Sequence, residues 1–405
     1  MDNVTHALAG MLLAEAVCVY RGETRQPVRA AAYLVSALAN NLPDIDVFYS
    51  SWMEPRPLGG LLNHRGHTHT LLLALPLAWL LGWAAYRWFS RKNPAASAAE
   101  RRLFVGISLV GVVLHLGMDF GNNYGVHPFW PLNNRWFYGD SIFIVEPLWL
   151  AFAIPIVAAR LQRRWLKLVL WAVLGAVLVV CWFVPFVPTA SRLLVLSVTA
   201  LAFGVARRAS ERVRIGFALI GCLAVAVVFA ACSMAAKAEL RRATEAAFPA
   251  LEVHDIAATP MPANPLCWEG LLAGEQGGSY RVLRASVALG PVSARDCNAG
   301  VDVEPTASVT RVMRADRGGV RWLSEYRADI AALRRLRRDD CRFRGFLRFA
   351  RLPYVSASGA LAGDLRYDRK PELDFSDIHL PKDPHVGGCP RLPGWTEPRA
   401  RLFQP

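Results

Sequence analysis

A histidine-rich hexapeptide, His64-Arg65-Gly66-His67-Thr68-His69, leads directly into the uncharged run 70–86. Three imidazoles therefore stand at the start of a segment that is apolar enough to enter a bilayer. A histidine cluster at such a boundary is well suited to holding a divalent metal at a membrane surface. The alternative is an interfacial or solvated loop, and composition alone does not separate the two. The positions of the other polar residues decide between them.

The composition indicates a membrane protein with an attached soluble domain. The chain has 405 residues, of which 54% are hydrophobic, and the apolar residues are unevenly distributed. Residues 1–236 carry 20 Lys/Arg and 11 Asp/Glu between long uncharged runs, whereas residues 237–405 carry 26 and 21. We therefore predict a membrane-embedded α-helical domain over 1–236 and a small soluble α+β domain over 237–405.

Eight apolar runs predict membrane helices. They lie at about 4–20, 28–42, 70–89, 103–119, 142–159, 165–186, 190–206 and 214–236. The first two are short against the roughly 20 residues of a full span, so six to eight membrane helices are expected. Of the 20 basic residues in this part, 16 lie in four alternate connections, which should therefore be cytoplasmic. With eight crossings the soluble domain is expected to be extracytoplasmic. The net charge is +14, but no nucleic-acid partner is expected, because most basic residues of residues 1–236 lie in the connections between membrane helices.

The soluble part contains dispersed cysteines and a mixed pattern of strands and helices. Two disulfides are expected in an oxidising compartment, in one of three connectivities, and four free thiols are the alternative. The cysteines are Cys267, Cys297, Cys341 and Cys389. Alternation predicts strands at 280–289 and 364–370, and apolar spacing predicts an amphipathic helix at 325–338.

Histidines and carboxylates from separate segments all fall at the outer ends of the predicted helices. His115 and Asp119 are four apart on one helix face and are costly there unless they pair or function. Asp44 and Asp46 follow a proline and can bridge two metals, or they simply end a helix. Imidazole with carboxylate suits zinc, manganese or iron. The residues on this side are His6, Asp44, Asp46, His64, His67, His69, His115, Asp119, Asp140 and Glu146, of which the last two are alternatively loop or cap residues.

Four ordered motifs resemble the YdjM-like family of bacterial inner-membrane metal-dependent hydrolases. They are Asp2–Gly10 (DNVTHALAG), Leu42–Asp46 (LPDID), His64–His69 (HRGHTH) and His115–Asp119 (HLGMD). The resemblance covers residues 1 to about 150, with weaker similarity at Pro265–Trp268 and Phe346–Phe349. It implies a multi-helix membrane protein with a metal centre and hydrolase activity. The ligands that it implies are His6, Asp44, Asp46, His64, His69, His115 and Asp119, whereas His67 stands where the family usually has an apolar or aromatic residue.

These observations predict a hydrolase of the bacterial inner membrane whose metal centre faces the periplasm. Zinc is the expected metal, with manganese or iron as alternatives. Asp140 is the predicted general base, and Arg65 is predicted to orient an anionic group such as a phosphate. A site at headgroup depth favours a lipid or phosphoester substrate. The rivals are a non-catalytic membrane protein that binds or transports metal, and a metal that only stabilises the fold.

Overall fold

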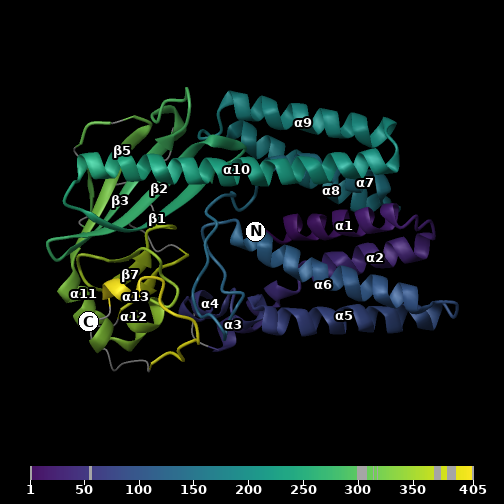
Figure 1. Ribbon diagram of the computed structural model, residues 1–405, viewed down its shortest axis with the longest axis horizontal. Coiled ribbons are helices and arrows are strands. Elements are labelled where there is room, and N and C mark those ends of the chain that lie inside the picture. Colours follow the sequence, from purple (N-terminus) through teal and green to yellow (C-terminus); the bar gives the residue numbers. More distant parts are fainter. Residues whose placement is uncertain are drawn as a thin grey trace.

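The protein consists of a helical bundle and a smaller sheet-containing part that lie end to end (Figure 1). The computed structural model describes residues 2–53, 57–298, 308–312, 314–316, 318–368, 375–380 and 389–403. The long bundle elements are α1 (Asn3–Tyr20), α2 (Gln26–Ala39), α5 (Leu71–Lys92), α6 (Ala98–Phe120), α7 (Pro147–Arg160), α8 (Arg164–Phe183), α9 (Thr189–Arg208) and α10 (Glu211–Ala247). Between α2 and α5 lie η1 (Pro43–Ile45), α3 (Asp46–Met53), α4 (Leu58–Asn63) and η2 (His67–His69).

Within the described residues, six helices are long and apolar enough to cross a membrane, namely α1, α5, α6, α8, α9 and α10. The helical N-terminal part is thereby confirmed, and its six candidate membrane helices stand at the lower end of the predicted six to eight. Helices α2 and α7 have only 14 residues each. The apolar run expected from 142 becomes helical only at Pro147, because the Glu146 side chain accepts the Leu148 N–H as an N-cap and proline favours the first helical turn.

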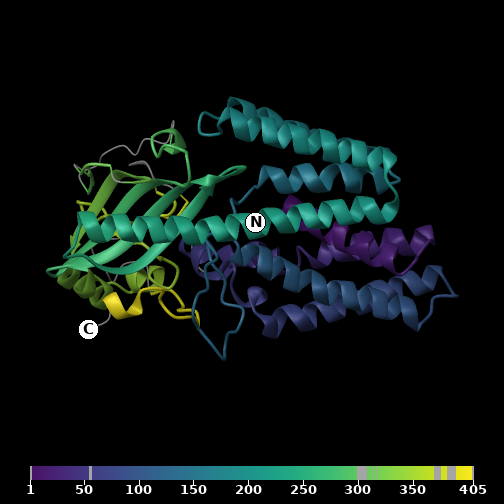
Figure 2. The ribbon, with the colours of Figure 1, turned by 45° about the horizontal axis from the view of Figure 1, so that its top comes forward.

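Consecutive long helices of the bundle run in alternate directions (Figures 1 and 2). The four turns that the sequence flanks with Arg and Lys, 21–25, 93–97, 161–163 and 209–210, all lie at the end remote from the sheet. Segments 40–53, 57–70 and 121–146 lie at the other end, beside the sheet-containing part. The candidate ligands, which the sequence places at helix ends, therefore all lie at the same end of the bundle.

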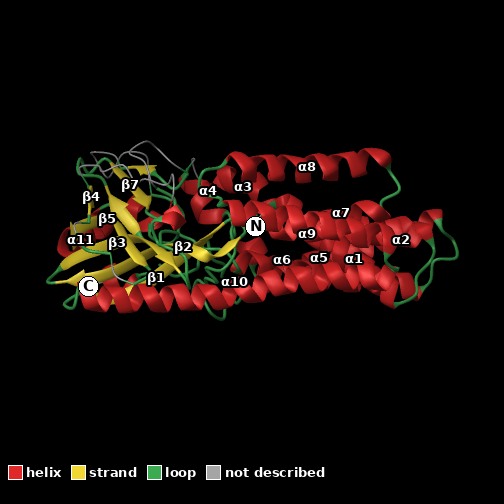
Figure 3. Cartoon of the chain, turned by 90° about the horizontal axis from the view of Figure 1, so that it is seen from above, coloured by secondary structure: helices red, strands yellow, loops and turns green. Residues whose placement is uncertain are grey.

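Helix α10 joins the two parts of the molecule (Figure 3). Its 37 residues correspond to about 56 Å at 1.5 Å per residue, enough to leave the bundle and continue along the sheet. Leu240 and Ala243 of this extension share a buried apolar cluster with Trp268 and Leu283 of the sheet. The domain boundary predicted after residue 236 falls within this continuous helix, and the division into domains stays a prediction.

The main sheet is antiparallel, with strand order β1-β2-β3-β5-β4. Alternate residues of its strands face α10 on one side and a second cluster on the other, where Tyr280 and Val282 pack with Phe343 and Phe346. Its strands are β1 (Glu252–Met261), β2 (Asn264–Gln276), β3 (Ser279–Ala288), β4 (Val309–Arg311) and β5 (Val320–Asp329). The remaining elements are η3 (Asp296–Asn298), α11 (Ile330–Asp339), α12 (Cys341–Phe346), β6 (Pro353–Val355), β7 (Leu361–Asp364), β8 (Ile378–His379) and α13 (Ala400–Phe403).

The local predictions for this part are correct in one place and wrong in two. The strand at 280–289 is confirmed as β3. The helix predicted at 325–338 is wrong in its first five residues, because they belong to β5 and the helix starts after Asp329, whose side chain caps Ala331 N. The strand predicted at 364–370 is wrong, since β7 ends at Asp364 and a turn follows; residues 369 and 370 lie outside the described residues.

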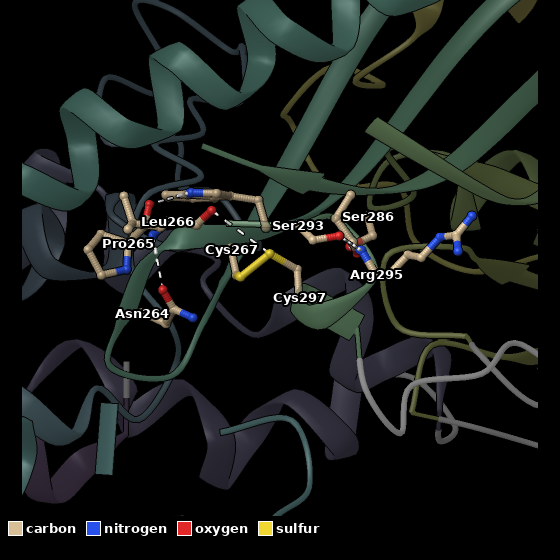
Figure 4. The surroundings of a disulfide bond; sticks show 10 residues. Asn264, Pro265, Leu266, Cys267, Ser286, Ser293, Arg295 and Cys297 are labelled. Carbon is tan, nitrogen blue, oxygen red and sulfur yellow. Dashed lines mark hydrogen bonds between the residues drawn. A yellow bond between two sulfur atoms is a disulfide. The ribbon is translucent and has the colours of Figure 1, made fainter. Parts of the chain in front are cut away.

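Two disulfides join the four cysteines of the sheet-containing part. Cys267 pairs with Cys297, and Cys341 pairs with Cys389. The first bond ties β2 to η3, the short helix that follows β3, as Figure 4 shows. The structure thus selects one of the three connectivities that the sequence allowed.

Candidate metal centre

The predicted ligands meet at the end of the bundle that faces the sheet. His6 lies in the first turns of α1, Asp44 in η1 and Asp46 at the start of α3. His69 closes η2, and the last turns of α6 supply the other members of the set. All but one of these side chains are less than 10% exposed. The buried ones are His6, Asp44, Asp46, His69, His115 and Asp119, and His64 is partly exposed.

Four of these residues form a compact group. One ligand atom from each of Asp44, His69, His115 and Asp119 lies within 4.8 Å of the others. His69 Nε2 is 3.4 Å from Asp44 Oδ1 and 3.3 Å from Asp119 Oδ2. His115 Nε2 is 3.7 Å from the same Asp44 oxygen and 3.4 Å from the same Asp119 oxygen. Two imidazole nitrogens and two carboxylate oxygens thus face one another.

The other ring nitrogen of each histidine determines which atom is left for a ligand role. His115 Nδ1 lies 2.8 Å from the backbone oxygen of Asn40, which can only accept, so this nitrogen carries the proton. His69 Nδ1 donates in the same way to Asp46 Oδ2 at 3.0 Å. The two Nε2 atoms, 3.1 Å apart, are left as acceptors together with the two carboxylates. Four acceptors at one point repel one another unless a proton or a metal cation lies among them, so this donor set fits a metal ion.

The pKa values of Asp44, Asp46 and His69 reflect the negative charge that the carboxylates bring to this group. Burial alone would raise the carboxyl pKa of Asp44 and Asp46, but hydrogen bonds and charge interactions with His69 and its neighbouring histidines lower both pKa values. Burial alone would lower the pKa of His69, but its bonds to Asp119, Asp44 and Asp46 raise it to about 10. Positive charge is therefore strongly favoured at this point, and either a second proton on His69 or a bound cation can supply it.

A second, overlapping group consists of Asp44, Asp46 and His64. His64 Nδ1 lies 2.9 Å from Asp46 Oδ1, and the Thr68 hydroxyl donates to Asp46 Oδ2 at 3.1 Å. Both oxygens of Asp46 are thus hydrogen-bonded, and it orients His64 and His69. Asp44 is the carboxylate that both groups share.

His6 and Arg65 border the compact group through Asp119. His6 Nε2 is 3.3 Å from Asp119 Oδ1, and its ring stacks on His115 with centroids 3.9 Å apart. Arg65 donates from Nη2 to Asp119 Oδ1 at 2.9 Å and from Nη1 to the Asp119 backbone oxygen at 3.1 Å. Arg65 therefore fixes the orientation of Asp119.

Asp140 lies in a different environment from the cluster. Its carboxylate accepts from Arg351 at 2.7 and 3.0 Å and from Lys237 at 2.7 Å. Burial raises its pKa, but these two cations lower the pKa below its ordinary value. The contacts fasten the 121–146 connection to α10 and to the sheet-containing part. Its role as a general base stays a prediction.

Two residues at this end, Asn40 and His127, were not predicted as site residues, and Glu146 was predicted either as a site residue or as a loop or cap residue. Asn40 accepts the proton of His115 Nδ1 and donates from its side chain to the His6 backbone oxygen. His127 is buried against the Trp395 ring at 4.2 Å. Glu146 accepts from the backbone N–H groups of Leu148 and Ala263, and burial raises its pKa to about 7. Polar residues at helix ends were the available signal, but only tertiary contacts assign them roles.

His67 does not join the cluster. Its ring lies edge-on to Trp130 and Trp395, with centroids 4.9 and 5.4 Å away. The departure from the family pattern at this position thus coincides with an aromatic contact between the bundle end and the C-terminal part.

A cavity of about 430 Å³ opens beside the cluster. His64 and Arg65 line it from the side of the cluster, and Phe375 lines it from the C-terminal part. The 121–146 connection supplies polar and apolar walls. The other lining residues are Asn122, Asn123, Tyr124, Ile142, Phe143, Ile144, Thr259, Arg366 and Tyr367.

Residues 1–185 match the family described as "YdjM inner membrane protein". The match ends just after α8 and contains every predicted ligand, so the resemblance expected from the motifs is confirmed over this part of the chain. Comparison with curated proteins finds no match, and comparison with solved structures finds none either.

Proposed function

Because residues 1–185 are those of the YdjM inner-membrane family, we propose that the protein is a membrane-bound metal-dependent hydrolase. Asp44, His69, His115 and Asp119 would hold the ion. The observation that carries this proposal is the convergence of four acceptor atoms within 4.8 Å of one another, with the Nδ1–H groups of both histidines used elsewhere.

The donor set suits zinc best. Two imidazoles and two carboxylates supply the four ligands that this ion commonly takes, and manganese or iron accepts the same atoms. When bound, such an ion polarises a phosphoryl or carbonyl oxygen and lowers the pKa of a coordinated water. The protein contributes the fixed ligand positions through Asn40, Asp46 and Arg65.

His64 is the group best placed to move a proton. It is 28% exposed, lines the adjacent cavity and is oriented through Nδ1 by Asp46. An imidazole held by a carboxylate is a common general base or acid. Asp140, the base expected from the sequence, is instead held by two cations. We therefore assign the proton transfer to His64.

The adjacent cavity supports a lipid or phosphoester substrate. Its walls combine side-chain amides of Asn122 and Asn123 with an apolar edge that includes Ile144 and Phe375, each 53% exposed. A molecule with a polar head and an apolar tail can contact both kinds of surface at once. Arg65 and Arg366 add positive charge beside the polar wall, although both also bond to carboxylates.

The orientation in the membrane follows from charge. The basic turns lie at the end opposite the cluster, and basic turns face the cytoplasm in inner-membrane proteins. The cluster and the C-terminal part would then face the periplasm. Two disulfides in that part agree with an oxidising compartment.

Elemental analysis of the detergent-purified chain tests the metal site. Wild type should carry zinc, manganese or iron in stoichiometric amount, and His115→Ala should lose it. His254→Ala is the matched control, because His254 lies on β1 and is 29% exposed. If wild type neither carries nor takes up metal, the proposal fails.

Assays on the metal-loaded protein then distinguish a hydrolase from a metal transporter. We expect release of phosphate or headgroup from a panel of phospholipids and lipid phosphates, abolished by His64→Ala with metal retained. Metal binding without hydrolysis, together with metal uptake into vesicles containing the protein, would favour the non-catalytic rival.

A further inference from the structure

A second cavity, of about 600 Å³, opens at the opposite end of the bundle from the His/Asp cluster. It lies between α2, the end of α5, the 161–163 turn and the start of α8. Its lining is mainly apolar. Leu34, Trp88 and Trp165 are each more than half exposed, so the cavity opens sideways, toward the lipid that surrounds the helices.

Arg29, Tyr33 and Arg160 line this cavity and belong to a balanced charge network, here called the floor network. Buried Glu15 accepts from Arg29 at 2.7 Å and from Tyr33 at 2.6 Å, and it forms an ion pair with Arg160 at 2.9 Å. Arg160 also pairs with Glu211 at 2.7 Å. Two carboxylates and two guanidinium groups neutralise one another, so the floor network needs no ligand for its charge balance.

The rim of the cavity carries two further cations. Lys92 ends α5, and Arg163 is the N-cap residue of α8. Both side chains are exposed, and the Lys92 ammonium lies 4.7 Å from the centre of the Trp88 ring. Within the described part of the chain, neither is a partner of Glu15 or Glu211 in the floor network. The rim therefore holds positive charge above an apolar hollow.

We propose that this cavity binds an anionic phospholipid of the surrounding leaflet. The phosphate lies between Lys92 and Arg163, and an acyl chain lies against Leu34 and Ala37 of α2. Tryptophan beside Lys or Arg at a helix end marks headgroup depth, and basic pockets between membrane helices bind acidic headgroups. A zwitterionic lipid gains less from the two cations, and a free phosphate leaves the apolar lining uncovered. The site is independent of the metal centre.

Lipid binding to the delipidated full-length protein in non-ionic detergent tests the charge requirement. The ligands are phosphatidylglycerol and phosphatidylcholine with the same acyl chains, and inorganic phosphate. Wild type should prefer phosphatidylglycerol, and Lys92→Gln/Arg163→Gln should weaken that binding about 30-fold, since two cations near the phosphate are removed. The matched control is Arg87→Gln/Arg207→Gln, which removes the same charge at the same end but outside the cavity lining, and should change affinity less than threefold.

A second variant tests the apolar part without altering charge. Ala30→Phe places a ring in the cavity from an exposed position of α2, and should weaken phosphatidylglycerol binding while the unfolding midpoint is retained. Three results would overturn the proposal: equal binding of both lipids, an equal loss in the control double variant, or inorganic phosphate binding as tightly as the lipid.

Discussion

The two ends of the helical bundle both bury charged side chains, but they balance the charge differently. At the remote end, the carboxylates of Glu15 and Glu211 meet the guanidinium groups of Arg29 and Arg160. At the sheet end, the carboxylates of Asp44 and Asp119 meet the Nε2 atoms of two histidines. The carboxylates at the remote end are thus balanced by guanidinium groups, whereas the four ligand atoms at the sheet end need a proton or a cation among them.

This difference separates a structural network from a binding site. A buried ion pair whose partners are all satisfied needs nothing further, and its removal affects stability. A buried group of acceptors is unstable by itself and becomes favourable when a cation binds. The same residue types, acids at helix ends, therefore have opposite functional meaning at the two ends.

The largest effect is expected from removing a carboxylate at the sheet end. Asp119→Asn deletes the negative charge that faces both Nε2 atoms, and metal content should fall below detection. Elemental analysis measures this. Glu15→Gln is the matched change at the other end and should leave metal content unchanged; loss of metal in both variants would remove the distinction between the ends.

Glu15→Gln should instead lower stability. The change leaves Arg29 and Arg160 with one carboxylate between them, and breaking a buried pair costs about 3 to 5 kcal/mol. The unfolding midpoint in detergent measures the loss. Glu23→Gln is the control, because its partner Arg25 is 57% exposed and such exposed pairs contribute little to stability. Equal midpoints for both variants would contradict a structural role for the network.

Glu146 offers a third kind of buried carboxylate, held by backbone N–H groups. Burial raises its pKa to about 7, so the folded state keeps the proton that the unfolded state releases above about pH 4.5. Wild-type stability should therefore fall between about pH 4.5 and 7, by up to about 3 kcal/mol. Glu146→Gln mimics the neutral form and should remove this dependence. Unfolding midpoints from pH 5 to 8 measure it, and parallel profiles would refute it.

The smallest expected effect concerns Asp46, which supports the ligand histidines through hydrogen bonds. Asp46→Asn should weaken metal binding by about 10- to 100-fold while a full equivalent still binds at saturation. A titration with zinc against a competing chelator measures the affinity. Complete loss of metal, as expected for Asp119→Asn, would make Asp46 a ligand.

Much of the bundle could be predicted from the sequence. Long uncharged runs identify helices because an apolar segment of this length is stable in lipid, and the basic turns identify one end of the bundle. The spacing of His115 and Asp119 places both on one helix face. The family motifs add the remaining predicted ligands.

The C-terminal part was predicted less well. The 325–338 segment combines apolar spacing with basic residues, yet its first five residues extend β5 because they pair with β3. Helix α10 passes the predicted domain boundary because its apolar residues continue from the bundle onto the sheet. Such outcomes depend on partners that are distant in the chain.

By itself, the sequence determined which segments are apolar enough to form candidate membrane helices, which connections are basic and which residues are chemically able to bind metal. These properties depend on composition and on spacing along a single helix. Only the tertiary structure decided that Asp44 faces both Nε2 atoms while Asp46 bonds to Nδ1, and that Asn40 orients His115. The reason is geometric, because hydrogen-bond partners and charge balance arise only when segments far apart in the chain are brought within a few ångströms.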